Sequence, residues 1–173
     1  MRKKSDAQEG VAVNLFNHHF IDLEGNRLYL DRYRNMPFFV VNIATESLFA
    51  PQLSRLQALY SLNEAAGLRI LAIPCNDFDE EPRDEAEIAE FLRENYPVNF
   101  LVTQRYAVTG QEMHPLFREM VQEHSSAILP RGTFHKYLFD RRGEFVESWK
   151  PHVLPDDPGL INAIQKHLTA KSL

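Results

Sequence analysis

Residues 38–53 read FFVVNIATESLFAPQL and decide how the chain folds. The continuous apolar run Phe38–Ala44 is typical of a strand that is buried on both faces. From Pro51 onward, apolar residues recur at helical spacing as far as Gly67, which predicts a helix with proline in its first turn. Ser47 therefore lies in the turn before a helix, where backbone N–H groups and the helix dipole favour an anion or a thiolate.

The rest of the chain alternates predicted strands and helices around this unit. A second buried strand at 68–73 completes a strand-helix-strand unit with a right-handed crossover and parallel pairing. Further elements are a hairpin at 20–30, a helix capped by Asp84 and Glu87, a short strand at 98–102, a helix opened by Pro115, a hairpin at 135–149 and a helix opened by Asp157-Pro158. This order predicts an α/β, thioredoxin-like fold: a mixed central sheet flanked by helices, preceded by an N-terminal hairpin.

Length and composition indicate one globular domain. The 173 residues are 44% hydrophobic and 25% charged, enough for one core. Residues 1–13 are predicted to form a flexible polar arm and 14–173 the domain. The net charge of -5, without a basic stripe, argues against a nucleic-acid partner. No apolar run is long enough to cross a bilayer, so we expect a cytoplasmic protein with no membrane partner.

Metal and disulfide sites are not expected. Cys75 is the single cysteine, which excludes an intramolecular disulfide and a cysteine-based metal cluster. The acidic run from Asp77 to Glu85 lacks EF-hand spacing, and the seven histidines lack metal-ligand spacing. We therefore predict no metal and no bound cofactor.

Several segments, in order along most of the chain, resemble the glutathione peroxidase family. They are Val41-Asn42-Ile43-Ala44-Thr45-Glu46-Ser47-Leu48-Phe49-Ala50, Ile73-Pro74-Cys75-Asn76-Asp77-Phe78, Glu80-Glu81-Pro82, Val108-Thr109-Gly110, His114-Pro115-Leu116 and Phe134-His135-Lys136-Tyr137-Leu138-Phe139-Asp140. The resemblance implies a thioredoxin-like fold and reduction of hydroperoxides with glutathione or thioredoxin as the reductant.

The same resemblance implies that the catalytic residues are replaced. In the family a peroxidatic selenocysteine or cysteine, a glutamine, a tryptophan and an asparagine form the site. Their places here are held by Ser47, Glu80, Gly132 and Thr133, and the place of the resolving cysteine of some members is held by Leu92. Hydroperoxide reduction needs a thiolate or selenolate that is oxidised and then reduced by a second thiol, and a serine hydroxyl has no such oxidation state.

Other residues offer alternative candidate sites. Cys75 could act as a substitute peroxidatic thiol, although its acidic neighbours favour a structural role. Arg131 and Arg83 could hold an anion such as the carboxylates of glutathione, although solvated arginines are more common. Engineered replacement of a natural cysteine would explain Ser47 but not the other changes. Ser47 has no glycine-flanked elbow of the hydrolases, which favours a capping role.

The sequence therefore leaves three hypotheses. The first is a pseudoenzyme that has lost hydroperoxide reduction and has a binding or regulatory role, connected with oxidative stress or thiol metabolism. The second is a weak thiol peroxidase that works through Cys75, or an unrecognised chemistry. The third is an interaction protein that uses the sheet edge or the vacated cleft. The expected partner is a small thiol or a protein at the former active-site cleft, and the expected state is a monomer or weak dimer.

Overall fold

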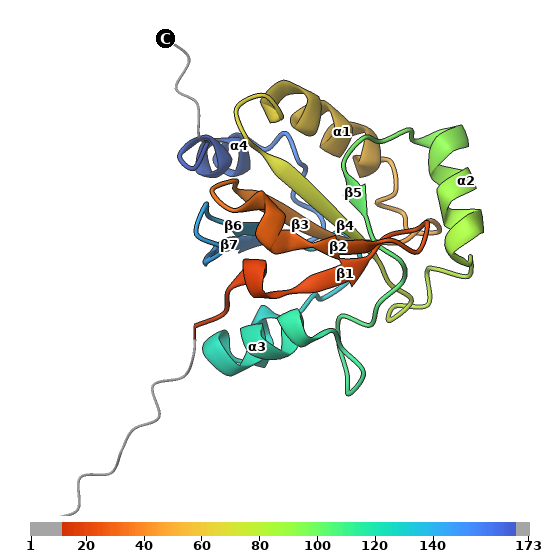
Figure 1. Cartoon of the computed structure of the whole chain (residues 1–173). Coiled ribbons are helices and arrows are strands. Elements are labelled where there is room, and N and C mark those ends of the chain that lie inside the picture. The colour runs from red at the N-terminus through yellow and green to blue at the C-terminus, as the bar shows by residue number, and fades with distance from the viewer. Residues whose placement is uncertain (1–11, 169–173) are drawn as a thin grey trace, which may run out of the picture.

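A five-stranded mixed sheet forms the centre of the molecule (Figure 1). The computed structural model describes residues 12–168. The strands lie in the order β5-β4-β3-β6-β7, and their bounds are β3 Phe38–Ile43, β4 Arg69–Pro74, β5 Leu101–Val102, β6 Lys136–Phe139 and β7 Phe145–Trp149. All six residues of β3 are buried. The prediction of a central strand covered on both faces is confirmed.

The pairing of β3 makes the sheet mixed. It runs parallel to β4, with Val41 opposite Ala72, and antiparallel to β6, with Val41 opposite Lys136. The parallel pair is the predicted strand-helix-strand unit, and the antiparallel pair brings in the late hairpin. Residues 41 and 136, which are far apart in the sequence, are therefore direct neighbours in the sheet.

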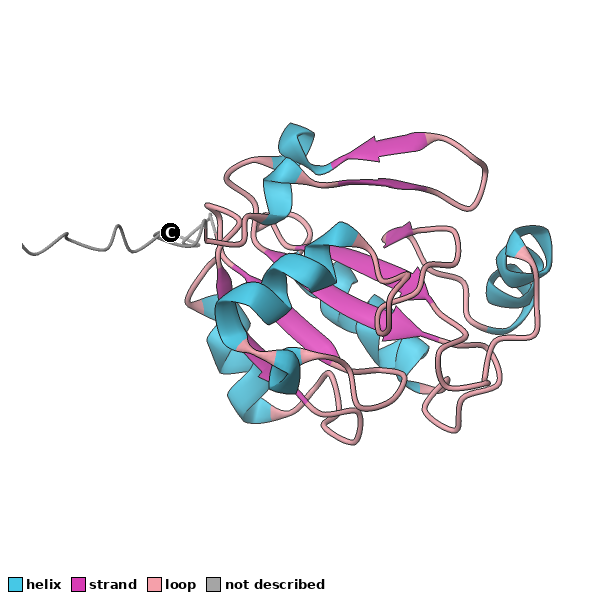
Figure 2. Cartoon of the chain, turned by 90° about the horizontal axis from the view of Figure 1, so that it is seen from below, coloured by secondary structure: helices cyan, strands magenta, loops and turns pink. Residues whose placement is uncertain are grey.

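Helices cover both faces of the sheet, as Figures 1 and 2 show from two sides. Alternate residues of β3 supply two separate cores. Phe39 and Val41 pack with residues of α1, α2 and α4, whereas Phe38 and Val40 pack with residues of α3 and of the N-terminal segment. The helix bounds are α1 Gln52–Asn63, α2 Glu85–Asn95, α3 Pro115–His124 and α4 Pro158–Gln165. The predicted thioredoxin-like layout is confirmed.

The N-terminal hairpin is a separate two-stranded sheet. Its strands are β1 His19–Ile21 and β2 Arg27–Tyr29, and short 3-10 helices flank it at Leu15–Asn17 and Leu30–Tyr33. Residues 1–11 of the predicted arm lie outside the described residues. Val13, which the sequence assigned to the arm, is 2% exposed and packs in the core.

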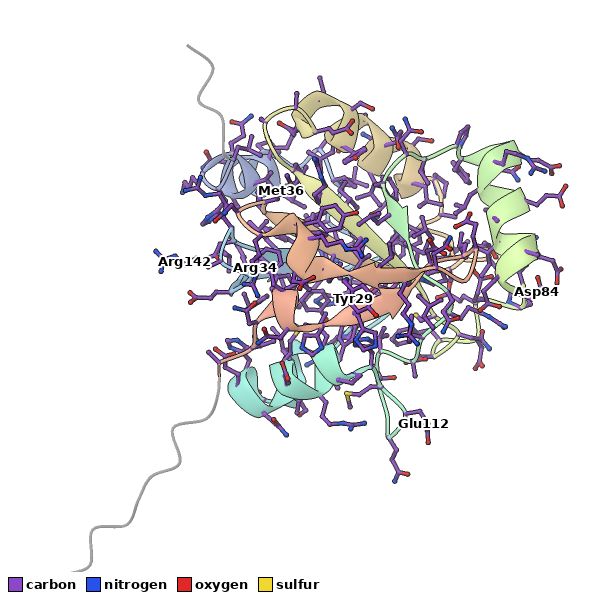
Figure 3. All side chains as sticks on the ribbon, in the orientation of Figure 1. Tyr29, Arg34, Met36, Asp84, Glu112 and Arg142 are labelled. Atoms are coloured by element: carbon purple, nitrogen blue, oxygen red, sulfur yellow. The ribbon has the colours of Figure 1, made fainter. Side chains whose placement is uncertain are left out.

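Helix signals in the sequence correspond closely to the structure. Asp84 and Glu87 form the predicted capping box of α2, and Asp84 is labelled at the start of that helix in Figure 3. Asp157 caps α4 through the N–H groups of Gly159 and Leu160. The predicted strand at 98–102 is only two residues long, because the pairing with β4 is limited to Leu101 and Val102. Within residues 12–168, no helix has the length and apolar character needed to cross a membrane.

Helix α1 offers a matched test of its packing. Leu56 is fully buried in the core between the sheet and the helices α1, α2 and α4, whereas Leu62 on the same helix is 81% exposed. We expect Leu56→Ala to lower the free energy of unfolding by about 2–5 kcal/mol, because it removes buried methyl groups and leaves a cavity. Leu62→Ala should change it by no more than about 0.5 kcal/mol. Chemical denaturation of both variants measures the difference, and equal losses would contradict the assigned burial.

Candidate functional site

Three of the four residues at the predicted catalytic positions meet at the turn between β3 and α1. Ser47 is 6% exposed, and its Oγ lies 2.8 Å from Oγ1 of Thr133. Oγ1 of Thr133 lies in turn 3.0 Å from Oε1 of Glu80. The backbone N–H of Phe49 donates to Oγ of Ser47 at 3.1 Å. Residues 47, 80 and 133 therefore form one continuous hydrogen-bonded chain.

Gly132 lies beside this chain without a side chain to add to it. Its carbonyl accepts a hydrogen bond from Nδ2 of Asn42 at 2.9 Å. A Cβ atom at this position would meet Cγ of Pro151 at 3.5 Å, an ordinary van der Waals contact. The backbone here does not require glycine, so a larger residue could begin at this position without displacing its neighbours.

Asn42 positions the segment that carries Thr133, and the sequence analysis did not single it out. The side chain is 99% buried; its Nδ2 donates to the carbonyl of Gly132, and its Oδ1 accepts from the N–H of His135 at 3.0 Å. The carbonyl of Asn42 accepts from the N–H of Phe134 at 2.6 Å. Phe134 itself has a φ of 67°, which L-residues rarely adopt. The signal that could have identified Asn42 is an amide within a wholly apolar strand, since buried polar groups need partners.

A second set of contacts holds the turn from the other side. Glu81 is 1% exposed, and its carboxylate accepts from the N–H and the hydroxyl of Thr45. Burial raises the pKa of Glu81, and the hydrogen bonds from Thr45 oppose that shift. Arg83 donates to Oγ1 of Thr45 at 2.8 Å and pairs with Glu46. Residues 80–83 therefore hold the turn through hydrogen bonds to its backbone and to its side chains.

The two arginines proposed as anion ligands differ in their surroundings. Arg83 is engaged with Glu46 and Thr45, and its guanidinium lies 4.7 Å from the ring centroid of Phe91. Its hydrogen-bonding groups are thus directed at the protein. Arg131 is exposed, and its backbone N–H faces Nδ1 of His135 at 3.5 Å. Neither arginine is brought into hydrogen-bond contact with Ser47 or Glu80 in the described part of the chain.

Cys75 lies at the end of β4 next to Asn42, not at the surface. It is fully buried, and its Sγ is 3.6 Å from Nδ2 of Asn42. Burial is the largest cause that raises the pKa of the Cys75 thiol, to about 12, and the charges of Asp77 and Glu80 act in the same direction. A thiol with these surroundings is protonated at neutral pH and shielded from substrates.

Lys136 is a buried cation that the sequence analysis also did not single out. Its side chain is fully buried at the start of β6, and its Nζ donates to the carbonyls of Phe134 at 2.7 Å and Pro151 at 3.0 Å. Nε2 of Gln52, at the start of α1, donates to the same carbonyl of Pro151 at 2.8 Å. Burial lowers the pKa of Lys136 to about 7. The signal in the sequence was a lysine inside an apolar strand.

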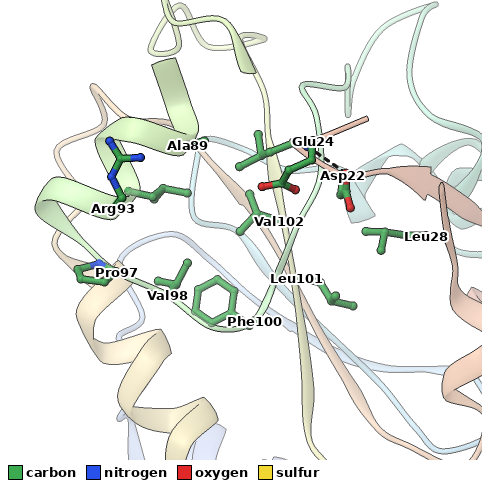
Figure 4. A pocket seen from close by; sticks show the side chains of 12 residues that line it. Asp22, Glu24, Leu28, Ala89, Arg93, Pro97, Val98, Phe100, Leu101 and Val102 are labelled. Atoms are coloured by element: carbon green, nitrogen blue, oxygen red, sulfur yellow. Dashed lines mark hydrogen bonds between the residues drawn. The ribbon is translucent and has the colours of Figure 1, made fainter. Parts of the chain in front are cut away.

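Leu92, at the position that the resemblance assigns to a resolving cysteine, lines a separate groove (Figure 4). This groove has a volume of about 340 Å³ and lies between the N-terminal hairpin, α2 and the segment that leads into β5. Leu92 on α2 is 4% exposed and lines it together with Phe100 and Val98. The lining is mainly aliphatic and aromatic, so this position now contributes to packing.

No group of three or more histidine, cysteine, aspartate or glutamate side chains within residues 12–168 is arranged to hold a metal ion. What the candidate site offers instead is a set of hydroxyl and carboxylate oxygens at the start of a helix.

Comparisons with known proteins agree on one family. The glutathione peroxidase family model matches residues 15–121. The chain is similar to a glutathione peroxidase of Lactococcus lactis subsp. cremoris, with 32% identity over 84% of this chain and 94% of the relative. It is also similar to the glutathione peroxidase homolog BsaA of Bacillus subtilis, with 35% identity over 84% of this chain and 93% of the relative. Among solved structures, Trgpx in its apo form has a TM-score of 0.72 and 22% identity over 90% of this chain and 95% of its own, a likeness in fold.

The burial of Cys75 predicts a slow reaction with thiol reagents. We expect Ellman's reagent to modify the native protein far more slowly than the denatured protein, because the thiol is enclosed and protonated. A Ser61→Cys, Cys75→Ala variant, whose single thiol lies at an exposed position of α1, should react rapidly when native. Similar rates for the native wild type and this variant would contradict the buried position of Cys75.

The buried Lys136 predicts a stability that increases with pH. Its pKa is about 7 in the folded protein and about 10.4 in an unfolded chain, so between these values the unfolded state binds more protons. The free energy of unfolding should therefore rise from pH 7 to pH 8, by up to about 1.4 kcal/mol per pH unit, below the pH at which the raised pKa of Cys75 begins to act in the opposite direction. Denaturation across this range should show a smaller rise for Lys136→Met, and an unchanged rise for Lys150→Met at an exposed position. Identical pH profiles for the wild type and Lys136→Met would disprove the assignment.

Proposed function

Since the chain belongs to the glutathione peroxidase family, we propose that it binds a ligand or partner at the former peroxidatic site and does not reduce hydroperoxides. One observation carries the proposal: in the turn between β3 and α1, position 47 carries a hydroxyl, which is hydrogen-bonded to Thr133. Ser47 does not cap α1, whose N-cap is Pro51. The helix N-terminus stabilises an anion, but an alcohol is not ionised there as a thiol would be.

The chemistry of the replaced residues supports the loss of turnover. Reduction of a hydroperoxide requires a sulfur or selenium atom that accepts an oxygen and then returns to its reduced state. Ser47 cannot do this, and Leu92 supplies no second thiol. Cys75 is buried with a raised pKa, which counts against its use as a substitute. The chain, with Cys75 as its one cysteine, therefore offers no pair of thiols that could carry out this oxidation and reduction.

Glu80 adds an electrostatic argument. Its carboxylate is two hydrogen bonds away from Oγ of Ser47, through Thr133. A negative charge this close opposes a second negative charge at position 47, since like charges raise the pKa of an acid. The surroundings thus disfavour a thiolate even if the sulfur were restored.

We place the binding role in thiol metabolism or the response to oxidative stress, in the cytoplasm and in a monomer or weak dimer. A small thiol or a protein partner would occupy the cleft, and glutathione or thioredoxin would serve as a reductant only if activity remained. The intact turn supports this role: Thr45, Glu81 and Arg83 still hold its geometry although the redox residue is gone.

A peroxidase assay tests the loss of activity. We expect no consumption of hydrogen peroxide or cumene hydroperoxide with either glutathione or thioredoxin and their reductases, beyond the rate without protein. An active member of the family serves as the positive control. Turnover comparable to that enzyme would overturn the proposal.

Stepwise substitution by the family's residues tests whether the residues around position 47 contribute to the absence of peroxidase activity. Ser47→Cys alone should give little activity, because Glu80 opposes the thiolate. Further substitution of this variant by Glu80→Gln, Gly132→Trp and Thr133→Asn should raise the rate of peroxide consumption by about 10-fold or more. The reason is that removal of one stabilising donor from an active site lowers kcat by about that factor or more. A matched Ser54→Cys variant, with the sulfur at an exposed position of α1, controls for adventitious thiols. Full activity of Ser47→Cys alone would show that Glu80 and Thr133 are not inhibitory.

A further inference from the structure

The hydrogen-bonded chain at the site has a direction that follows from its chemistry. A carboxylate accepts hydrogen bonds and has no proton to donate. The hydroxyl of Thr133 must therefore donate its one proton to Oε1 of Glu80 at 3.0 Å. Its remaining contact, 2.8 Å to Oγ of Ser47, is then one in which Thr133 accepts and Ser47 donates. The proton of Ser47 consequently points into the protein.

The side-chain groups of the site that remain free are acceptors. Oγ of Ser47 accepts from the N–H of Phe49 and retains one lone pair, since a hydroxyl oxygen can accept twice. Glu80 is half-buried, and its Oε2 has no hydrogen-bond partner among the described residues, whereas its Oε1 is occupied by Thr133. A ligand that bonds to these two side chains must therefore bring the hydrogen-bond donors.

The charge of Glu80 is not neutralised by the described part of the protein. None of the six ion pairs within residues 12–168 includes Glu80. The neighbouring Arg83 is committed to Glu46 and Thr45. A partly buried carboxylate with a free oxygen favours a cation, and hydrogen bonds to charged groups are about twice as strong as neutral ones.

Apolar side chains flank the same turn. Leu48, next to Ser47, is 94% exposed, and Phe49 is 37% exposed. Both follow Ser47 directly in the sequence, within the turn that leads to α1. A ligand that contacts Glu80 can place an apolar body against them, and covering these side chains would stabilise the complex.

We propose that this site binds a primary ammonium group attached to an apolar body, such as an alkylamine or the side chain of a lysine beside an apolar residue. The ammonium donates to Oε2 of Glu80 and to Oγ of Ser47, and the apolar part covers Leu48 and Phe49. This inference rests on the proposed binding function and names its ligand class. The presence of a carboxylate, where the family has a neutral glutamine, is the change that selects a cation.

Titrations followed by amide chemical shifts of Ser47, Phe49 and Thr133 test the inference. The probes are n-pentylammonium, 1-pentanol and pentanoate, which share an apolar body and differ in charge. We expect n-pentylammonium to bind about 10-fold more tightly than 1-pentanol, the difference made by one charged hydrogen bond, and pentanoate to bind more weakly than both. Equal or tighter binding of pentanoate, or no binding of the amine, would overturn the inference.

Two variants test whether the preference for the amine comes from Glu80 or from any nearby negative charge. Glu80→Gln keeps the shape of the side chain and should reduce the affinity for n-pentylammonium to that for 1-pentanol. Asp79→Asn removes the neighbouring exposed carboxylate, which is in none of the ion pairs of the described residues, and should leave the amine preference unchanged. An equal loss in both variants, or no loss in Glu80→Gln, would refute the role of Glu80.

A peptide distinguishes the two sources of the ammonium group. Tighter binding of Nα-acetyl-leucyl-lysinamide than of n-pentylammonium assigns the site to a protein lysine, and the reverse order assigns it to a small amine. Failure of both ligands refutes the amine site but leaves the absence of peroxidase turnover intact. Turnover in the peroxide assay would refute the proposed function whatever the titrations show.

Discussion

The side-chain amide of Asn42 is the contact on which the candidate site depends. It lies within β3, where both faces are apolar, and among the described residues its hydrogen-bond partners are the carbonyl of Gly132, the N–H of His135 and the thiol of Cys75. An unpartnered amide at this depth would be costly, so residues 132–135 are held against the end of β3. This places Thr133 over Ser47, and Thr133 then reaches Glu80.

The geometry of the site does not depend on the side chain at position 47. The turn between β3 and α1 is held by Glu81 and Arg83 through Thr45, contacts that do not involve the residue at position 47. The replaced residues are also consistent with one another: Ser47, Thr133 and Glu80 satisfy each other's hydrogen bonds in an order that a carboxylate dictates. The side chains of Ser47 and Glu80 that remain free are hydrogen-bond acceptors, which is the basis for the binding role proposed above.

The sequence predicted most of the fold because the relevant signals are local. The apolar runs of β3 and β4, the capping box of Asp84 and the proline after Asp157 each act within a few residues. It overestimated β5, since the length of a strand depends on how far its neighbour continues to pair with it. Asn42 and Lys136 were missed as positioning residues, because a polar residue in an apolar run does not indicate which distant group it meets.

The sequence by itself determined the fold class, the place of Ser47 before a helix and the absence of a redox-active residue at that position, since these follow from residue identity and short-range pattern. Only the tertiary structure decided that Ser47, Thr133 and Glu80 form one directed chain, that Cys75 is enclosed and that Arg83 is engaged by Glu46. The physical reason is distance along the chain: these contacts join residues brought together by the pairing of β3 with β4 and β6, and hydrogen-bond direction depends on which groups meet.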